Sequence, residues 1–256
     1  MTRTSRSLKD PPIVEAVLDI ECDLPPNFRP ATLEQQAQKK FFKSYPIFRK
    51  QYLQNYQFDV KQPDELPEIS IKPGRVQALQ FFKEDEKQLI QIRSQGFSFN
   101  RLAPYTTLDN YLPQIKKAWT SFDELVKPIQ IRVLRLRYIN SFSLPLGYNN
   151  QIQLEEYFKN APISADEGRL LLSGFVNQYT AIDRSSGHQV VSVLTTQTSL
   201  DNQLPVIFDN SIIVHEEIET GDWTKIRAKI LEMRELKNLI FWNTLTEKCL
   251  NLFQQH

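Results

Sequence analysis

The chain has 256 residues, 41% hydrophobic and 24% charged, with 31 basic and 30 acidic side chains and a net charge of +1. This balance is typical of a globular protein with a sizeable core. It gives no overall charge signal for binding nucleic acid or an anionic membrane. The polar start of the chain and the lack of a long apolar run predict a cytoplasmic protein with no membrane partner.

The first half of the chain alternates strand-like and helix-like patterns. Residues 1–10 are polar and are predicted to form a flexible arm. Apolar and acidic residues alternate over residues 13–22, which predicts a strand with one solvated face. A helix is expected over residues 30–45, followed by an extended connection over residues 47–68. The other predicted elements of this half are strands at 76–82, 89–93 and 97–101 and a helix at 110–126.

The second half is predicted to begin with a long strand over residues 129–144, after Pro128. Its apolar positions change parity near Val133 and Leu134, which either a β-bulge or burial of both faces would explain. The chain is predicted to end in one long helix over residues 222–253, with Asp222 as N-cap and apolar side chains at steps of three and four. Between these lie a short predicted helix at 152–158 and β-type runs at 169–182, 189–198 and 205–218.

Both halves have the predicted element order β-α-β-β-β-α. Short turns favour antiparallel pairing, because parallel neighbours need long crossovers. We therefore predict an α+β fold in which an antiparallel sheet packs on helices. Residues 11–128 and 129–256 would form the two halves of one compact unit. An internal duplication would explain the repeated order, and so would chance, because few sequence positions match between the halves.

Arginines are concentrated on the predicted strand 129–144. Arg135 and Arg137 would point to the same side, where their guanidinium groups repel unless acids or an anion separate them. One interpretation is a surface for an anion or for the phosphate backbone of nucleic acid. Its candidate residues are Arg132, Arg135, Arg137, Asn140, Asn100 and Arg101.

The alternative for these arginines is ion pairing across the sheet, because strand acids are available and the overall charge is balanced. We favour this interpretation. The candidate acids are Glu15, Asp19, Glu216 and Glu217.

Signatures of catalysis and of cofactor binding are missing from the sequence. It contains no glycine-rich phosphate loop and no nucleophile elbow. His215 and Glu217 would share one strand face, but two ligands do not make a metal site, so we predict a surface pair. Cys22 and Cys249 lack zinc-type spacing and are predicted to be buried free thiols. We expect no catalytic residue, cofactor or metal.

Four stretches in order resemble an uncharacterised, sporadically distributed bacterial protein family with an N-terminal P-P-I-V-E-A strand and a C-terminal K-N-x-I-F helix. The stretches are residues 11–17, 97–101 with the helix 111–122, 134–140, and 236–242 with 246–248 and Phe253. The resemblance spans nearly the full length and implies no established activity. A patchy distribution, of the kind shown by mobile or defence-associated genes, implies an interaction or sensing role by association.

Three hypotheses for function follow from the sequence. The leading one is a non-enzymatic binding or regulatory protein that acts through protein contacts, with an unidentified protein partner or as a homodimer. The second is nucleic-acid binding through the arginine-rich strand. The third is a small-molecule pocket or an undescribed enzyme, because a sheet that packs on a long helix can leave an apolar cavity between them.

Overall fold

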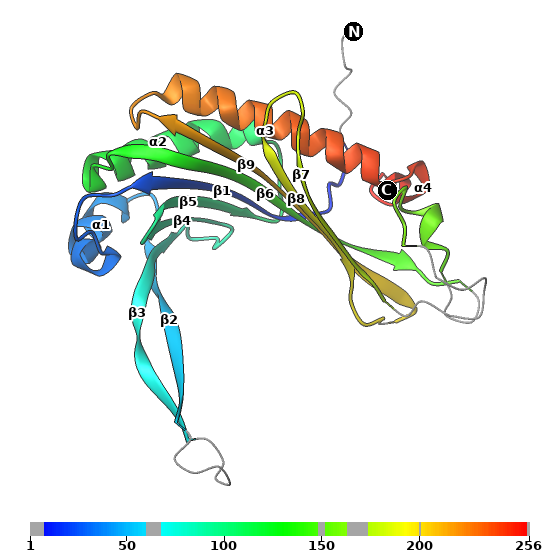
Figure 1. Cartoon of the computed structure of the whole chain (residues 1–256), viewed down its shortest axis with the longest axis horizontal. Helices are drawn as coiled ribbons and strands as arrows, with labels where there is room; N and C mark the ends of the chain where they lie inside the picture. Colours follow the sequence, from blue (N-terminus) through cyan, green and yellow to red (C-terminus); the bar gives the residue numbers. More distant parts are fainter. Residues whose placement is uncertain (1–7, 60–67, 148–151, 163–173, 200, 255–256) are drawn as a thin grey trace.

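The computed structural model describes residues 8–59, 68–147, 152–162, 174–199 and 201–254. These residues form one nine-stranded antiparallel sheet and four α-helices, which confirms the predicted α+β fold (Figure 1). The strands are β1 (Ile13–Asp23), β2 (Ile47–Asp59), β3 (Glu68–Phe82), β4 (Gln88–Arg93), β5 (Gly96–Leu102), β6 (Gln130–Pro145), β7 (Val176–Ile182), β8 (Gln189–Thr196) and β9 (Gln203–Ile218). The helices are α1 (Glu34–Phe41), α2 (Leu108–Val126), α3 (Trp223–Thr244) and α4 (Glu247–Asn251).

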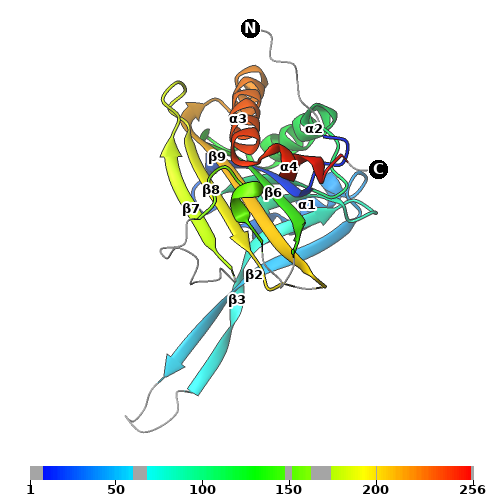
Figure 2. The same cartoon turned by 90° about the vertical axis from the view of Figure 1, so that its right-hand side faces the viewer.

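The two long helices α2 and α3 lie on the same face of the sheet (Figures 1 and 2). Strand β1 shows why this face is the apolar one. Leu18 and Ile20 are buried in the main core, whereas Asp19 and Glu21 alternate with them and point to the opposite face. The helices therefore cover the face that the sequence pattern marks as hydrophobic.

The strand order is β2-β3-β4-β5-β1-β6-β9-β8-β7, with β1 and β6 paired near the centre. Outward from the centre, β1 is followed by β5, β4 and β3, and β6 is followed by β9, β8 and β7. Four strands of each half therefore follow one arrangement, and β2 is an additional edge strand of the first half without a counterpart among the described strands of the second. Shared topology alone does not establish an internal duplication, which stays a prediction.

A register shift on β6 explains the parity change in its apolar pattern. Ile131 pairs with Cys22 on β1 and Val133 pairs with Glu21, so Arg132 is the extra residue. The pairing with β9 shifts at the same place. The bulge lies at Arg132, next to the predicted position, and it turns Leu134 toward the core.

The predicted extended connection at residues 47–68 is wrong over its first part, where β2 forms. Ile47 pairs with Phe82 and Asp59 with Glu68, so β3 supplies the hydrogen-bond partners that the sequence pattern did not indicate. Residues 60–67 lie outside the described part of the chain. Beyond Ala78, where pairing with β4 ends, β2 and β3 continue as a two-stranded arm that projects from the sheet (Figure 1).

The single terminal helix predicted over residues 222–253 is also wrong. Asp222 caps α3 as predicted, accepting a hydrogen bond from the Lys225 N–H at 2.9 Å, but α3 ends at Thr244. Leu245 is extended and bridges to Phe158, and Thr246 then caps α4. The break falls where the apolar spacing takes one step of five residues, from Ile240 to Leu245.

Three smaller elements also differ from the sequence-based prediction. The helix expected at 152–158 is a single 3-10 turn, η3 (Leu154–Glu156), and β7 is shorter than the run 169–182. Residues 169–173 lie outside the described part of the chain, as do residues 1–7 of the predicted arm. Within that arm Leu8 packs against the second core cluster, and the Asp10 N–H donates to the carbonyl of Phe253 at 3.2 Å.

Candidate functional site: a pocket beneath helix α3

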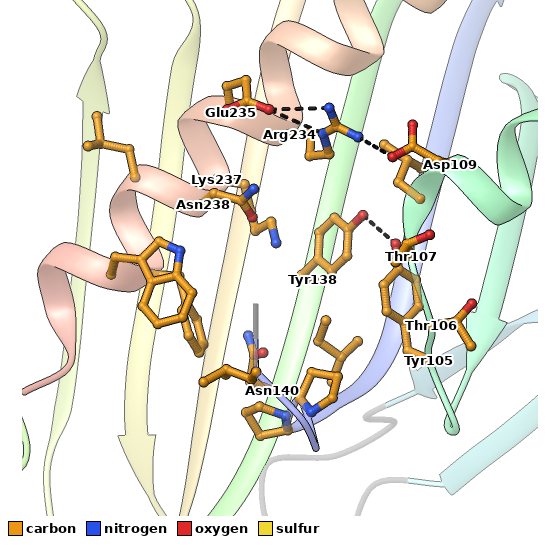
Figure 3. Close-up of a pocket in the computed structure, with 18 of the residues that line it drawn as sticks. Tyr105, Thr106, Thr107, Asp109, Tyr138, Asn140, Arg234, Glu235, Lys237 and Asn238 are labelled. Atoms are coloured by element: carbon orange, nitrogen blue, oxygen red, sulfur yellow. Dashed lines mark hydrogen bonds and ion pairs between the residues drawn. The ribbon is translucent and has the colours of Figure 1, made fainter. Parts of the chain in front are cut away.

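A pocket of about 780 Å³ lies between α3, the loop before α2 and the start of β1 (Figure 3). Four segments line it: the N-terminal segment at Leu8 and residues 11–13, the loop and first helical residues 105–109, Tyr138 and Asn140 on β6, and α3 from Arg234 to Asn243. Its volume is within the range of small-molecule sites, which is roughly 300–1,000 Å³.

Lys237 is the charged residue at the centre of this pocket. It is only 9% exposed, and its amino group lies 4.1 Å from the centre of the Tyr138 ring (Figure 3). Among the described residues, no hydrogen bond or ion pair to this amino group is found. Burial, aided by the positive charge of Arg234, lowers the pKa of Lys237 to about 8. The negative charge of Glu235 partly offsets this lowering of the pKa. Among the described residues, the amino group lies against the Tyr138 ring without a direct ion pair to a carboxylate.

Two tyrosines form a hydroxyl pair beside Lys237. The hydroxyl oxygens of Tyr105 and Tyr138 are 2.8 Å apart, and the two rings meet edge to face. Burial raises the pKa of Tyr138 to about 12 and also raises that of Tyr105. Both phenols are therefore neutral at physiological pH and act as hydrogen-bonding groups on an otherwise aromatic wall.

Asn140 supplies an acceptor at the floor of the pocket. Its side-chain nitrogen donates to the carbonyl of Phe208 at 2.9 Å, which fixes the orientation of the amide. The residue is 1% exposed, and no donor to its side-chain oxygen is found among the described residues. This oxygen is therefore available to a ligand that carries an N–H or O–H group.

An ion pair joins the two helices beside the pocket. Arg234 on α3 donates to Asp109 in the first turn of α2 at 2.9 Å and also pairs with Glu235 (Figure 3). Thr107 caps α2 by accepting a hydrogen bond from the Asn110 N–H. Arg234 thus has its own acids, which distinguishes it from Lys237.

The structure does not bring the six predicted anion-contact residues together. Arg135, Arg137 and Asn100 lie on the sheet face opposite to α2 and α3, and Arg132 lies in the bulge near the start of β6. Arg101 lies on the helix side, with its guanidinium over the ring of Tyr111. Of the six, only Asn140 lines the pocket.

The three arginines of β6 each lie against a carboxylate. Arg137 holds Asp209 with two donors, at 2.9 and 2.5 Å, and this contact raises the pKa of Arg137. Arg132 binds Asp23 and Glu217, and Arg135 lies 3.9 Å from Glu21. A phosphate would have to compete with these acids. Contact with nucleic acid through this strand stays a prediction.

Of the four acids suggested from the sequence, Glu217 is the one that forms an ion pair with these arginines. Glu15 accepts a hydrogen bond from Asn100 at 2.7 Å. That bond ends a ladder in which Gln80 donates to Gln91 and Gln91 donates to Asn100, both at 3.0 Å. Side-chain hydrogen bonds thus run across β3, β4, β5 and β1 on the face away from the helices.

Asp19 occupies a second polar cluster on that face. It is 7% exposed and accepts from Arg93 and from the hydroxyl of Ser98, both at 2.5 Å. Replacing Asp19 with alanine is expected to lower the free energy of unfolding by about 2 kcal/mol, because Arg93 would be left unpaired and Ser98 without its acceptor. Urea unfolding would measure the loss. The exposed turn residue Glu84 gives the control, and equal losses for Asp19→Ala and Glu84→Ala would contradict the prediction.

Sequence reasoning missed Lys237 because it was assigned to the polar side of the last helix. The buried positions of α3 include Met233, Lys237 and Phe241, at successive steps of four. The prediction instead followed Leu236 and Ile240, which are only partly buried. The available signal was that Lys237 fits the spacing of the most buried stripe, which is unusual for a charged residue.

His215 and Glu217 are not paired. His215 lies 3.4 Å from the side-chain oxygen of Gln189, and Glu217 binds Arg132. In the part of the chain that the structure describes, no group of three or more histidine, cysteine or acidic residues is placed to hold a metal. Both cysteines are free thiols, with Cys249 buried and Cys22 partly buried.

Among the described residues, no helix is both long and apolar enough to span a membrane.

The chain was also compared with known proteins. The resemblance to a bacterial family stays a prediction, because searches with protein-family models, among curated proteins and among solved structures find no match for this chain.

Proposed function

We propose that this chain binds a small organic anion in the pocket beneath α3, with Lys237 as the contact for the negative charge. The observation that carries the proposal is the buried amino group of Lys237, which forms no direct ion pair with an acid among the described residues. A buried cation without an ion-pair partner costs free energy. A carboxylate or phosphate on a ligand would remove that cost, so the pocket favours an anion over a neutral molecule.

The walls of the pocket suggest the rest of the ligand. Tyr138, Phe241 and Trp242 line it with aromatic surface, and Pro11 and Pro12 add apolar contacts from the N-terminal segment. The amide oxygen of Asn140 accepts a hydrogen bond. A flat or aromatic body with one anionic group and one donor matches this arrangement. The proposal develops the third sequence-based hypothesis, that of a small-molecule pocket.

Calorimetry with a panel of aryl carboxylates, from benzoate to 1-naphthoate, tests the proposal, with the corresponding primary amides as neutral probes. We expect the carboxylates to bind at least about tenfold more tightly than the amides, as one ionic contact provides. Their affinity should fall as the pH rises above 8, because the free Lys237 amine then loses its proton.

Two variants locate the effect. Lys237→Met should abolish the preference for carboxylates, whereas Arg227→Met, which removes an exposed charge from the same helix, should leave it unchanged. The proposal is overturned if no carboxylate in the panel binds more tightly than its amide. It is also overturned if Lys237→Met keeps the preference.

A further inference from the structure

We propose that β7 pairs antiparallel with β7 of a second copy of the chain, so that the two sheets join across a two-fold axis at Tyr179. The proposal rests on the sheet edge at β7, which has no further strand beside it among the described residues, and does not use the Lys237 pocket.

Strand β7 is the last strand of the sheet at one edge (Figure 2). Its seven residues, Val-Asn-Gln-Tyr-Thr-Ala-Ile, include no charged residue and no proline. Val176 is 71% exposed, Tyr179 40% and Ile182 70%. Sheet edges are usually protected from pairing by charges, prolines or bulges. At the opposite edge β2 carries Arg49 and Lys50, so β7 is the edge that lacks this protection.

The hydrogen bonds to β8 show which backbone groups of β7 point outward. The Asp183 N–H donates to the carbonyl of His188 at 2.8 Å, and the Thr196 N–H donates to the carbonyl of Phe175 at 3.1 Å. The odd-numbered residues of β7 therefore direct their N–H and C=O groups toward β8. Because these backbone groups point to alternate sides along an antiparallel strand, the even-numbered residues direct theirs away from β8. The outward N–H and C=O groups are those of Val176, Gln178, Thr180 and Ile182.

Pairing two copies about Tyr179 matches these outward groups. Val176 lies opposite Ile182 of the second copy, and Gln178 opposite Thr180, so each pair joins residues whose backbone groups point outward. The two most exposed aliphatic side chains of the strand thus meet. This register also places every one of the seven residues of β7 opposite a residue of the second copy, and any shifted register would leave some of them unpaired.

The side chains also fit a two-fold axis. Tyr179 meets its own copy at a position without backbone hydrogen bonds, where side chains are closest and an aromatic pair is favourable. No like charges face each other within the strand. The same surface serves both partners, as a two-fold interface requires.

A strand of seven residues forms a small interface, so the dimer should be weak and should depend on concentration. Sedimentation velocity of the full chain tests this over protein concentrations of about 5 to 500 μM, a range suited to transient contacts. We expect the sedimentation coefficient to rise from that of a monomer toward that of a dimer.

A charge at the edge tests the site of association. Ile182→Lys should weaken dimerisation by at least about tenfold, because a lysine on an edge strand opposes pairing with another strand. Ile129→Lys is the matched control, since Ile129 is similarly exposed at 65% but lies outside β7. This control should dimerise like the native chain.

A cysteine tests the register. Tyr179→Cys would place two thiols on opposed residues with Cα atoms about 4.5–5.5 Å apart, within reach of a disulfide. Mild oxidation with diamide, which takes up the two thiol hydrogens, should give a covalent dimer. Ile129→Cys should not do so. Burial raises the pKa of the native thiol of Cys249 to about 12 and also raises that of Cys22, so the native cysteines should stay unreactive.

Three results would overturn the proposal. One is a chain that stays monomeric over the whole concentration range. Another is a dimer that Ile182→Lys and Ile129→Lys affect equally. The third is a dimer in which Tyr179→Cys gives no more disulfide than Ile129→Cys, because the two strands would then not cross at Tyr179.

Discussion

Replacing Phe122 with alanine is expected to lower the free energy of unfolding by about 4 kcal/mol, as for other large cavities made in cores. Phe122 is fully buried on α2. Its ring centre lies 5.3 Å from that of Trp119 and 5.4 Å from that of Phe97 on β5. The change would leave a void between the helix and the sheet, which the surrounding structure would close only partially.

Urea unfolding followed by circular dichroism would measure this loss. Phe42→Ala provides the matched control, because Phe42 is 66% exposed and follows a different helix, α1. Its loss should stay below about 0.5 kcal/mol, as is usual for surface positions. Losses of similar size for Phe122→Ala and Phe42→Ala would contradict the assignment of Phe122 to the centre of the core.

Local patterns in the sequence were sufficient to predict the elements that bury one face. The apolar spacing on residues 110–126 matches α2, and the alternation on residues 13–22 matches β1. The parity change near Val133 located the bulge to within one residue. Each of these signals comes from the regular alternation between a buried and a solvated side, so it can be read from neighbouring residues alone.

Long-range pairing could not be predicted in this way. Strand β2 has no clear alternation, and it forms because β3 supplies its backbone partners from residues that follow the segment 60–67. At the break between α3 and α4, Leu245 bridges to Phe158, which lies far away in the sequence. In such contacts, the neighbouring residues in the sequence do not indicate which distant residue is the partner.

The candidate site shows the same limit. The arginines of β6 were recognised, together with the need for acids between them, but Asp209 and Asp23 were not identified as partners. The pocket brings together residues from four segments, and Lys237 is unusual only because the fold buries it. A lysine in an amphipathic helix gives no sign of burial in the sequence unless the buried stripe is traced residue by residue.

Replacing Lys237 with methionine is expected to raise the free energy of unfolding by about 3 kcal/mol below pH 8. The pKa of Lys237 in the folded chain is about 8, whereas the ordinary lysine value is 10.5. The gap between these values corresponds to about 3 kcal/mol of free energy. Between them the unfolded chain binds more protons than the folded chain, so the contribution of Lys237 to stability rises with pH.

This gives the prediction a definite pH window. The cost of burying the cation is complete below pH 8, declines between pH 8 and 10.5, and is absent above that range. Lys237→Met should remove the rise in stability that this residue causes across the window. Urea unfolding at pH 7 and at about pH 9.5 measures it, with Arg227→Met as the control for loss of an exposed charge. A stabilisation that is the same at both pH values would contradict the assigned cause.

The same variant links stability to the proposed ligand. A carboxylate in the pocket would balance the charge of Lys237, so ligand binding should recover much of the free energy that its burial costs. An aryl carboxylate should therefore raise the melting temperature of the native chain at pH 7 and leave that of Lys237→Met nearly unchanged. Equal shifts in both proteins would show that the anion binds elsewhere. A larger shift for the native chain than for Lys237→Met would support the proposed anion site.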